Sequence, residues 1–288
     1  MTVTEATTRT LQSPGATITY DVRPGGDGSQ PPLMLIGSPM GAAGFATLAG
    51  HFPARTIVTY DPRGAERSTK DDPSSESIPE QHAEDLHRVI QEVGGPVDLF
   101  ASSGGAVNAL ALVAAHPEDV RTLIAHEPPL AAILPDAENA KAAVRAISAT
   151  YEERGFGAGM AHFIAITGHR GEFPDDIALQ PAPDPSQFGM PAEDNGDRTD
   201  VMLHQTIIGT THYRPDFDAL RSASTRIVMA AGAESEGEMA NRGAHAVAKE
   251  LGTEVVVFPS HHGGFLGGEY GWGGEPDAFA KKLQEVLP

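Results

Sequence analysis

The chain has 288 residues and a net charge of −19, because 20 Lys and Arg residues oppose 39 Asp and Glu residues. This excess of negative charge repels phosphate backbones and anionic lipid. We therefore expect a small-molecule substrate, no nucleic-acid partner and no membrane partner, and we leave homo-oligomer formation open. The chain contains no cysteine, which excludes disulfides, cysteine nucleophiles and cysteine-bound metal sites.

The N-terminal residues do not have the pattern of a targeting segment. Residues 1–5 lack both a basic region and an apolar region, and the apolar stretch 109–115 is too short to span a bilayer. We therefore expect a cytoplasmic protein.

Short apolar runs alternate with helical stripes along most of the chain. The predicted strands comprise residues 16–22 (an edge strand), 33–36, 56–60, 97–101, 120–125, 226–230 and 255–258. The predicted helices comprise residues 79–93, 104–116, 238–251 and 276–287. This alternation is typical of an α/β fold in which helices cover both faces of a mostly parallel, doubly wound sheet.

The alternation is interrupted between residues 131 and 218, where no strand is predicted. This stretch contains two helical patterns and a proline-rich loop, at residues 137–153, 160–167 and 181–200. We interpret residues 131–218 as a helical cap inserted into a core formed by residues 1–130 and 219–288. A separate helical domain is the alternative.

The most informative segment places Ser103 between a predicted strand and a predicted helix. Ala101 and Gly105 flank it in a small-x-Ser-x-Gly pattern, which a nucleophile on a sharp strand-to-helix turn requires because the turn brings backbones together. The turn also places Ser103 at a helix N-terminus, where free N–H groups favour developing negative charge. The lysine of a phosphate-binding loop is absent from this segment, and a plain Gly-Ser turn is the remaining alternative.

With this motif, the chain resembles the α/β-hydrolase family over residues 16–130 and 219–288. Residues 61–68, DPRGAERS, are similar to the family's D-x-R-G-x-G-x-S loop, with Glu66 in place of the second glycine. Residues 36–40, IGSPM, stand where the family has H-G-G-P-G. The resemblance implies that Ser103 is the nucleophile, assisted by a histidine base and an orienting carboxylate.

The resemblance places the base in the loop after the last predicted strand. His262 fits the family pattern P-G-x-H-x-G-F, because Pro259, Gly264 and Phe265 hold that register; His261 is the alternative. An imidazole suits the task, since it titrates near neutrality and can take and return the serine proton. Adjacent histidines point apart and make a poor metal clamp, and we expect no metal and no cofactor.

The position of the carboxylate is less clear. The usual place in the family falls on Ser235, between Glu234 and Glu236. The other placement known in the family, directly after the strand that follows the nucleophile's helix, falls on Glu127. We favour Glu127, which keeps the chain order Ser, acid, His, and retain Glu234 as the alternative.

Acyl transfer also requires two N–H donors for the oxyanion. One is expected from Gly104, the residue after the nucleophile. The second is expected from Ser38 or, in a shifted alignment, from Met40, because Pro39 has no N–H.

Two apolar segments of the predicted cap are expected to expose one face to the substrate, so that some of their side chains contact it. These candidates are Phe163, Ile166, His204 and Ile207. Their apolar character predicts a medium-sized, mainly apolar ester or lactone.

Together these features predict a carboxylic ester hydrolase of the esterase or lactonase type, acting through a Ser103–His262–Glu127 triad and an acyl-enzyme. The same fold leaves three alternatives: a cofactor-free perhydrolase or haloperoxidase-like enzyme, a lyase or cyclase, and a non-catalytic binding protein. A dehalogenase or epoxide hydrolase is disfavoured, because these need Asp where Ser103 stands.

Overall fold

The computed structural model describes residues 5–288. Residues 1–4, on which the expectation about targeting partly rests, lie outside the described residues. Within residues 5–288, no helix is both long enough and apolar enough to cross a bilayer.

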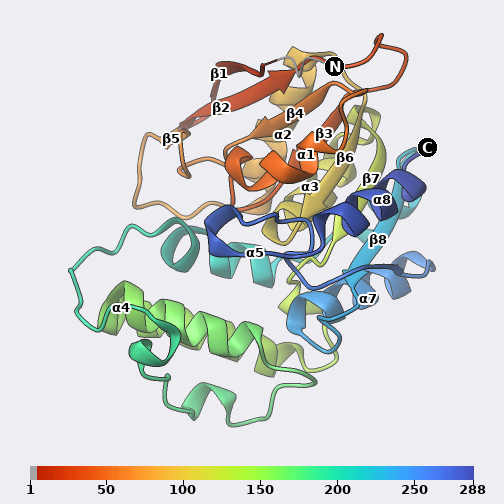
Figure 1. The fold of residues 1–288 in the computed structure, drawn as a ribbon. Helices are drawn as coiled ribbons and strands as arrows, with labels where there is room; N and C mark the ends of the chain where they lie inside the picture. Colours follow the sequence, from red (N-terminus) through yellow and green to blue (C-terminus); the bar gives the residue numbers. More distant parts are fainter. Residues whose placement is uncertain (1–4) are drawn as a thin grey trace.

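A mixed, mostly parallel sheet forms the centre of the molecule (Figure 1). Its strands are β1 (Thr7–Ser13), β2 (Ala16–Arg23), β3 (Leu33–Ile36), β4 (Ile57–Tyr60), β5 (Thr69–Lys70), β6 (Val97–Ser102), β7 (Val120–His126), β8 (Arg226–Gly232) and β9 (Val256–Phe258). The order is β1-β2-β4-β3-β6-β7-β8-β9, with β5 paired to β2. Pairing is parallel from β4 to β9 and antiparallel where β2 pairs with β1, β4 and β5. This confirms the predicted α/β class.

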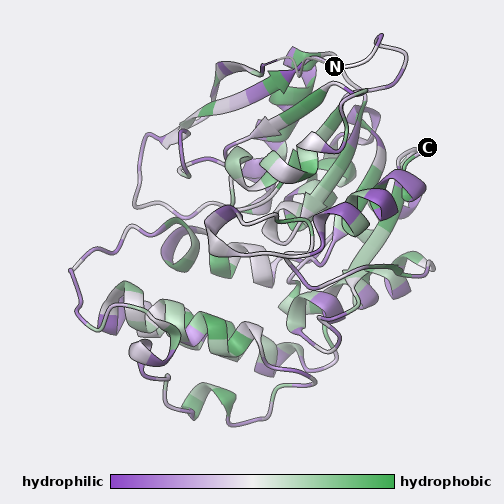
Figure 2. Cartoon of the chain, in the orientation of Figure 1, coloured by the Kyte–Doolittle hydropathy of each residue, from purple (hydrophilic) through white to green (hydrophobic). Residues whose placement is uncertain are grey.

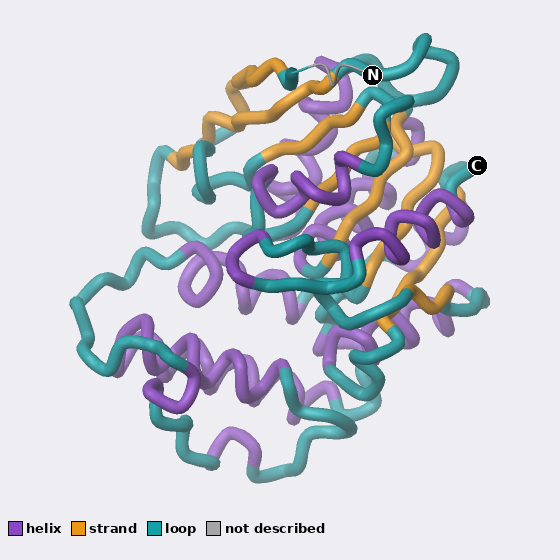
Figure 3. Tube along the Cα trace, viewed as in Figure 1, coloured by secondary structure: helices purple, strands orange, loops and turns teal. Residues whose placement is uncertain are grey.

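Helices lie on both sides of the sheet (Figure 3). They are α1 (Ala46–Gly50), α2 (Pro79–Val93), α3 (Gly104–Ala115), α4 (Ala137–Thr167), α5 (Ile207–His212), α6 (Phe217–Ser222), α7 (Met239–Leu251) and α8 (Pro276–Val286). Single-turn helices are η1 (Ala42–Phe45), η2 (Pro117–Asp119), η3 (Ala131–Ile133), η4 (Ile177–Leu179), η5 (Pro185–Phe188), η6 (Val201–Thr206) and η7 (Glu269–Gly271).

The central strands are largely hydrophobic in sequence (Figure 2). Their side chains fill a core on each face of the sheet, because each face carries its own helix layer. In β3, Met34 and Ile36 join the core beneath α2, α3 and α7. Leu33 and Leu35 join the opposite core, against α1 and α8. The period-2 alternation of strand side chains thus fills two cores at once, and the sheet is doubly wound.

Residues 16–22 were expected at an edge of the sheet, but they lie inside it. The strand β2 pairs with β1 on one side and β4 on the other, and β1 forms the edge. The residues of β1 are mostly exposed and polar, so they lack the apolar alternation from which a strand is predicted.

The segment between β7 and β8 forms its own small apolar core around α4. The two helices predicted in it are joined into α4 by a kink at Gly155, whose φ is 81°. This left-handed φ favours glycine; a Cβ at this position would also lie 2.3 Å from Asp194 Oδ1, so the Asp194 side chain would have to shift. We call residues 131–213 the helical insertion.

The helix α6 belongs with the core of the protein. It packs against α3 and α7, and Leu220 is part of the core beneath the sheet. The predicted boundary between residues 218 and 219 therefore falls within α6.

Candidate active site

The turn from β6 to α3 holds Ser103 in a strained backbone conformation, with φ 57° and ψ −129°. A positive φ is costly for a residue with a Cβ and persists only where the surroundings enforce it. Here the Ser103 N–H donates to the His126 carbonyl at 2.9 Å, and the Ser103 carbonyl accepts from the Ala106 N–H at 2.9 Å. The first turn of α3 begins directly after Ser103, as the motif requires.

The glycines after Ser103 allow this turn to pack directly on the loop after β3. A Cβ on Gly104 would lie 2.6 Å from the Ser38 carbonyl oxygen, and one on Gly105 would lie 2.8 Å from Gly37 Cα. Both contacts are too close for a side chain. The small-x-Ser-x-Gly pattern therefore reflects the contact between two loops at the carboxyl end of the sheet.

Glu127 and His262 form a hydrogen-bonded pair beside this turn. His262 Nδ1 lies 2.6 Å from Glu127 Oε2, and the Glu127 side chain is fully buried. Its other oxygen, Oε1, accepts from the Gly232 N–H at 2.8 Å and also from the Ser235 hydroxyl and the Asn241 amide. Each Glu127 oxygen thus has a fixed partner.

This environment keeps Glu127 ionised. Burial alone would raise its pKa, but the hydrogen bond from His262, the Ser235 hydroxyl and the nearby imidazoles together hold the pKa well below the usual range for Glu. Burial alone would lower the pKa of His262. The Glu127 hydrogen bond and the negative charges of Glu127 and Glu238 outweigh burial, and the pKa of His262 is raised above 6.5.

Another imidazole, His126, lies next to the turn that holds Ser103. It is fully buried, and this burial lowers its pKa to about 4, so it is neutral at pH 7. Its Nδ1 lies 3.2 Å from Ser102 Oγ, and its backbone carbonyl holds the Ser103 N–H.

Ser103 and His262 both line a cavity of about 350 Å³, together with Ser38 and Gly104. The opposite walls come from the helical insertion and from the start of α7. The insertion contributes mainly apolar side chains, including Val144, Ile147, Phe163, Met202 and Ile207. A cavity of this size and character fits a small apolar ligand.

Two of the four predicted substrate contacts lie elsewhere. Phe163 and Ile207 line the cavity, whereas Ile166 is buried in the core of the insertion. His204 bonds through Nδ1 to Glu152 at 2.8 Å and through Nε2 to the Ser74 carbonyl at 3.2 Å. An isolated histidine in an apolar run gives no sign of a partner 52 residues away.

The alternative catalytic candidates His261, Glu234 and Met40 are not among the residues that line this cavity. His261 Nε2 lies 3.2 Å from the Gly273 carbonyl. Glu234 is exposed, and its carbonyl accepts from Arg170 at 2.7 Å. Met40 packs its side chain against Gly37 and Gly44, while Ser38 lines the cavity.

Most residues of the cavity wall were not predicted from the sequence, among them three that lie outside the helical insertion. Glu238 and Met239 stand at the start of α7, and Trp272 comes from the loop between β9 and α8. Trp272 is 60% exposed, so it lies at the mouth of the cavity. A large apolar residue in an otherwise polar, glycine-rich loop was the available signal.

The mostly parallel sheet, the strained Ser103 turn and the Glu127–His262 pair together match the architecture of the α/β hydrolases. The chain is 32% identical over 263 residues to the uncharacterized hydrolase YraK of Bacillus subtilis, and the match covers 89% of each chain. The chain belongs to the α/β-hydrolase family. No protein-family model matches it.

Solved structures agree with this fold. An esterase from Exiguobacterium antarcticum superposes with a TM-score of 0.66 at 19% identity, covering 97% of this chain and 98% of that one. An α/β hydrolase from Sphaerobacter thermophilus superposes with a TM-score of 0.60 at 22% identity, covering 96% and 99%. These comparisons support a hydrolase activity.

Proposed function

We propose that this protein is a serine hydrolase that cleaves neutral, mainly apolar carboxylic esters or lactones with Ser103, His262 and Glu127. The observation that carries the proposal is the 2.6 Å bond between Glu127 Oε2 and His262 Nδ1, next to a strained Ser103 on the same cavity. The esterase named above and a thermophilic esterase from Thermogutta terrifontis share the fold, which is compatible with this activity.

The proposed chemistry follows from which nitrogen of His262 is free. Glu127 holds Nδ1, so Nε2 takes the proton as Ser103 Oγ attacks the carbonyl carbon. His262 then gives that proton to the departing alkoxide and leaves an acyl-Ser103 ester. Water, deprotonated by His262, attacks this ester, and His262 returns that proton to Ser103 Oγ as the bond to the acyl group breaks and the acid leaves. The backbone N–H groups of Gly104 and Ser38 are the proposed oxyanion donors.

Charge at the cavity wall favours neutral substrates. Glu238 lines the cavity, and its charge acts on His262. Arg170 pairs with Glu238 at 3.3 Å but is itself largely exposed, so the negative charge is only partly offset. A substrate carrying a carboxylate in this region would be repelled.

Labelling tests the nucleophile directly. A fluorophosphonate probe should label the chain at one site, and peptide mass spectrometry should place the adduct on Ser103. The Ser102→Ala variant is the matched control, because Ser102 is buried against His126, and it should still be labelled. A folded, unlabelled wild-type protein would contradict a serine-hydrolase mechanism.

Cavity volume should set the preferred acyl length. Ile207→Phe adds volume to the cavity wall and should lower kcat/KM for p-nitrophenyl octanoate at least about tenfold relative to the acetate, because one mismatched methylene group in an apolar pocket already has an effect of about that size. Ile208→Phe is the control, because Ile208 packs on the insertion core and is not among the cavity residues. Equal effects of both variants would show that the acyl chain binds elsewhere.

The pH profile should report the raised pKa of His262. Only neutral His262 can accept the Ser103 proton, so kcat/KM should rise with pH through an ionisation above 6.5. Glu238→Gln removes a negative charge that stabilises the protonated His262 ring. The variant should therefore shift this rise in kcat/KM, the acid limb of the pH profile, to lower pH. Glu236→Gln is the control and should leave the limb in place. A limb that disappears in His261→Ala and persists in His262→Ala would assign the base to His261.

A further inference from the structure

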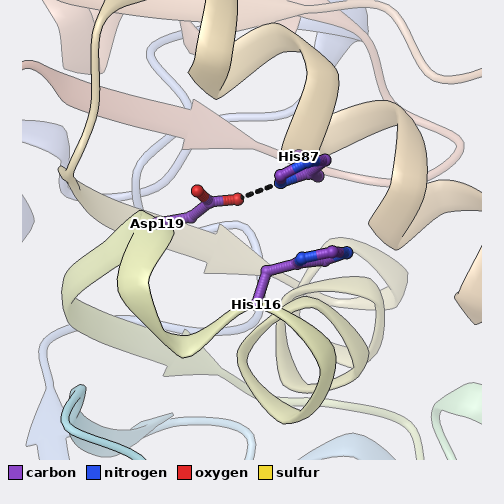
Figure 4. Close-up of side chains that lie close together, drawn as sticks. All are labelled: His87, His116 and Asp119. Atoms are coloured by element: carbon purple, nitrogen blue, oxygen red, sulfur yellow. Dashed lines mark hydrogen bonds and ion pairs between the residues drawn. The ribbon is translucent and has the colours of Figure 1, made fainter.

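A second cluster of ligand-type side chains lies at the opposite end of the sheet from Ser103. His87 comes from the middle of α2, His116 caps the end of α3, and Asp119 ends η2 just before β7 begins. Figure 4 shows the two imidazole rings one above the other, with the Asp119 carboxylate beside them. Neither the sequence motifs nor the proposed hydrolysis uses this cluster.

The three side chains are already gathered. His87 Nδ1 lies 2.6 Å from Asp119 Oδ2, and the rings of His87 and His116 stack with centroids 3.9 Å apart and planes 13° apart. One ligand atom of each residue lies within 4.8 Å of the other two. We infer that His87, His116 and Asp119 bind a divalent transition-metal ion of the zinc class.

The donor set selects this class of ion. Two imidazole nitrogens and one carboxylate oxygen suit Zn²⁺ and its neighbours, whereas Mg²⁺ and Ca²⁺ prefer oxygen ligands alone. Zinc–ligand bonds of about 2.0–2.1 Å in tetrahedral geometry place ligand atoms about 3.3 Å apart. The separations present, from 2.6 Å to at most 4.8 Å, bracket that value. Because the imidazole lone pairs lie in the planes of the two stacked rings, binding requires at least one ring to turn out of the stack towards the ion.

The surroundings provide support and access. Asp119 is buried, and its second oxygen accepts from Gln91 Nε2 at 2.8 Å, the kind of outer contact that orients a metal ligand. The two imidazoles are about a quarter exposed. A hollow of about 330 Å³ borders His87 and Gln91, which gives an ion and its water ligand a path from solvent.

The nearby charges favour a cation. Glu84 and Glu118 carboxylate oxygens lie 3.8 Å and 3.9 Å from the His116 nitrogens. Arg88, the basic residue in the hollow, pairs with Glu84 at 2.8 Å. The three carboxylates of Asp119, Glu84 and Glu118 therefore face the two imidazoles, against the single positive charge of Arg88.

Binding would replace the proton shared by His87 and Asp119 with the ion. Affinity should therefore fall at low pH, where protons compete for the imidazoles. A bound ion would link α2 to the connection between α3 and β7, and so stabilise the folded state without touching Ser103.

Zinc titration of the full chain tests the inference. The atoms of His126, Glu127 and His262 also lie within 4.8 Å of one another, so the measurement is made in a His262→Ala background to remove that second set. Calorimetry should give one Zn²⁺ per chain. Zinc at about 100 times its Kd should raise Tm by about 4 °C, and EDTA should reverse the shift.

Variants decide where the ion binds. His87→Gln and His116→Gln, which keep polar side chains, should each abolish the binding heat and the Tm shift; circular dichroism confirms that they fold. His245→Ala, an exposed histidine on α7, is the matched control and should bind Zn²⁺ normally. Absence of binding in the parent, or undiminished binding in both Gln variants, would overturn the inference and leave the cluster as a stacked imidazole pair.

Discussion

Replacing Ser103 with alanine is expected to lower the turnover of p-nitrophenyl butyrate by about 10³-fold or more. The loss follows from removal of the attacking oxygen, since the cavity, the Glu127–His262 pair and the backbone donors stay in place. Alanine also carries a Cβ, so it keeps the strained backbone of the turn as serine does. Initial rates and circular dichroism on the same preparation separate lost chemistry from lost structure.

The neighbouring serine provides the comparison. Ser102→Ala removes a hydroxyl whose side-chain partner is His126 Nδ1. Because this hydroxyl has no part in the proposed chemistry, the variant should keep its rate within about tenfold of the parent. If folded Ser103→Ala protein retains its turnover, the covalent mechanism is excluded.

Replacing Glu127 with glutamine is expected to lower kcat by at least about 10²-fold, and by up to about 10⁴-fold by analogy with a triad acid changed to its amide. The three donors on Oε1 require an oxygen there, so the amide nitrogen must face His262 Nδ1. That nitrogen donates, and His262 must then accept at Nδ1 and carry its proton on Nε2. In this tautomer, the ring cannot take the Ser103 proton.

Two further measurements separate this cause from a general loss of structure. The acid limb of the pH profile should move to lower pH in any residual activity, because Glu127 raises the pKa of His262. Glu234→Gln, at an exposed position, should change neither the rate nor the limb. A large loss in Glu234→Gln with little loss in Glu127→Gln would place the acid on the other loop.

The sequence predicted the elements in which local pattern and burial agree. The strands with continuous apolar runs and the amphipathic helices lie where expected to within a few residues. The edge strand β1 was missed because its exposed side chains carry no apolar alternation. The position of Glu127 was inferred from the family's strand order, and the structure pairs it with His262.

The cavity walls were predicted less well, because they depend on how separate segments meet. Phe163 and Ile166 are three residues apart in one apolar helix, yet only Phe163 lines the cavity. Periodicity shows that a helix has an apolar side but not whether that side faces a neighbouring helix or a ligand. Glu238 lines the cavity because the start of α7 meets it; the sequence predicted where this helix begins, but not that its first residues meet the cavity.

The position of Glu127 divides the proposed triad into a rigid part and a separable part. The strands β6 and β7 pair in register, with Ser102 opposite His126, so Ser103 and Glu127 each follow one of two paired residues. Both also have positive φ, 57° and 50°. The register of the two strands therefore fixes the spacing between the proposed nucleophile and acid. The proposed base, His262, is instead on a loop whose length does not affect that spacing. Residues 259–275, which contain His262 and Trp272, form one segment that can be exchanged between relatives by recombination. Such an exchange would replace the base and the mouth of the cavity and leave the spacing between Ser103 and Glu127 unchanged.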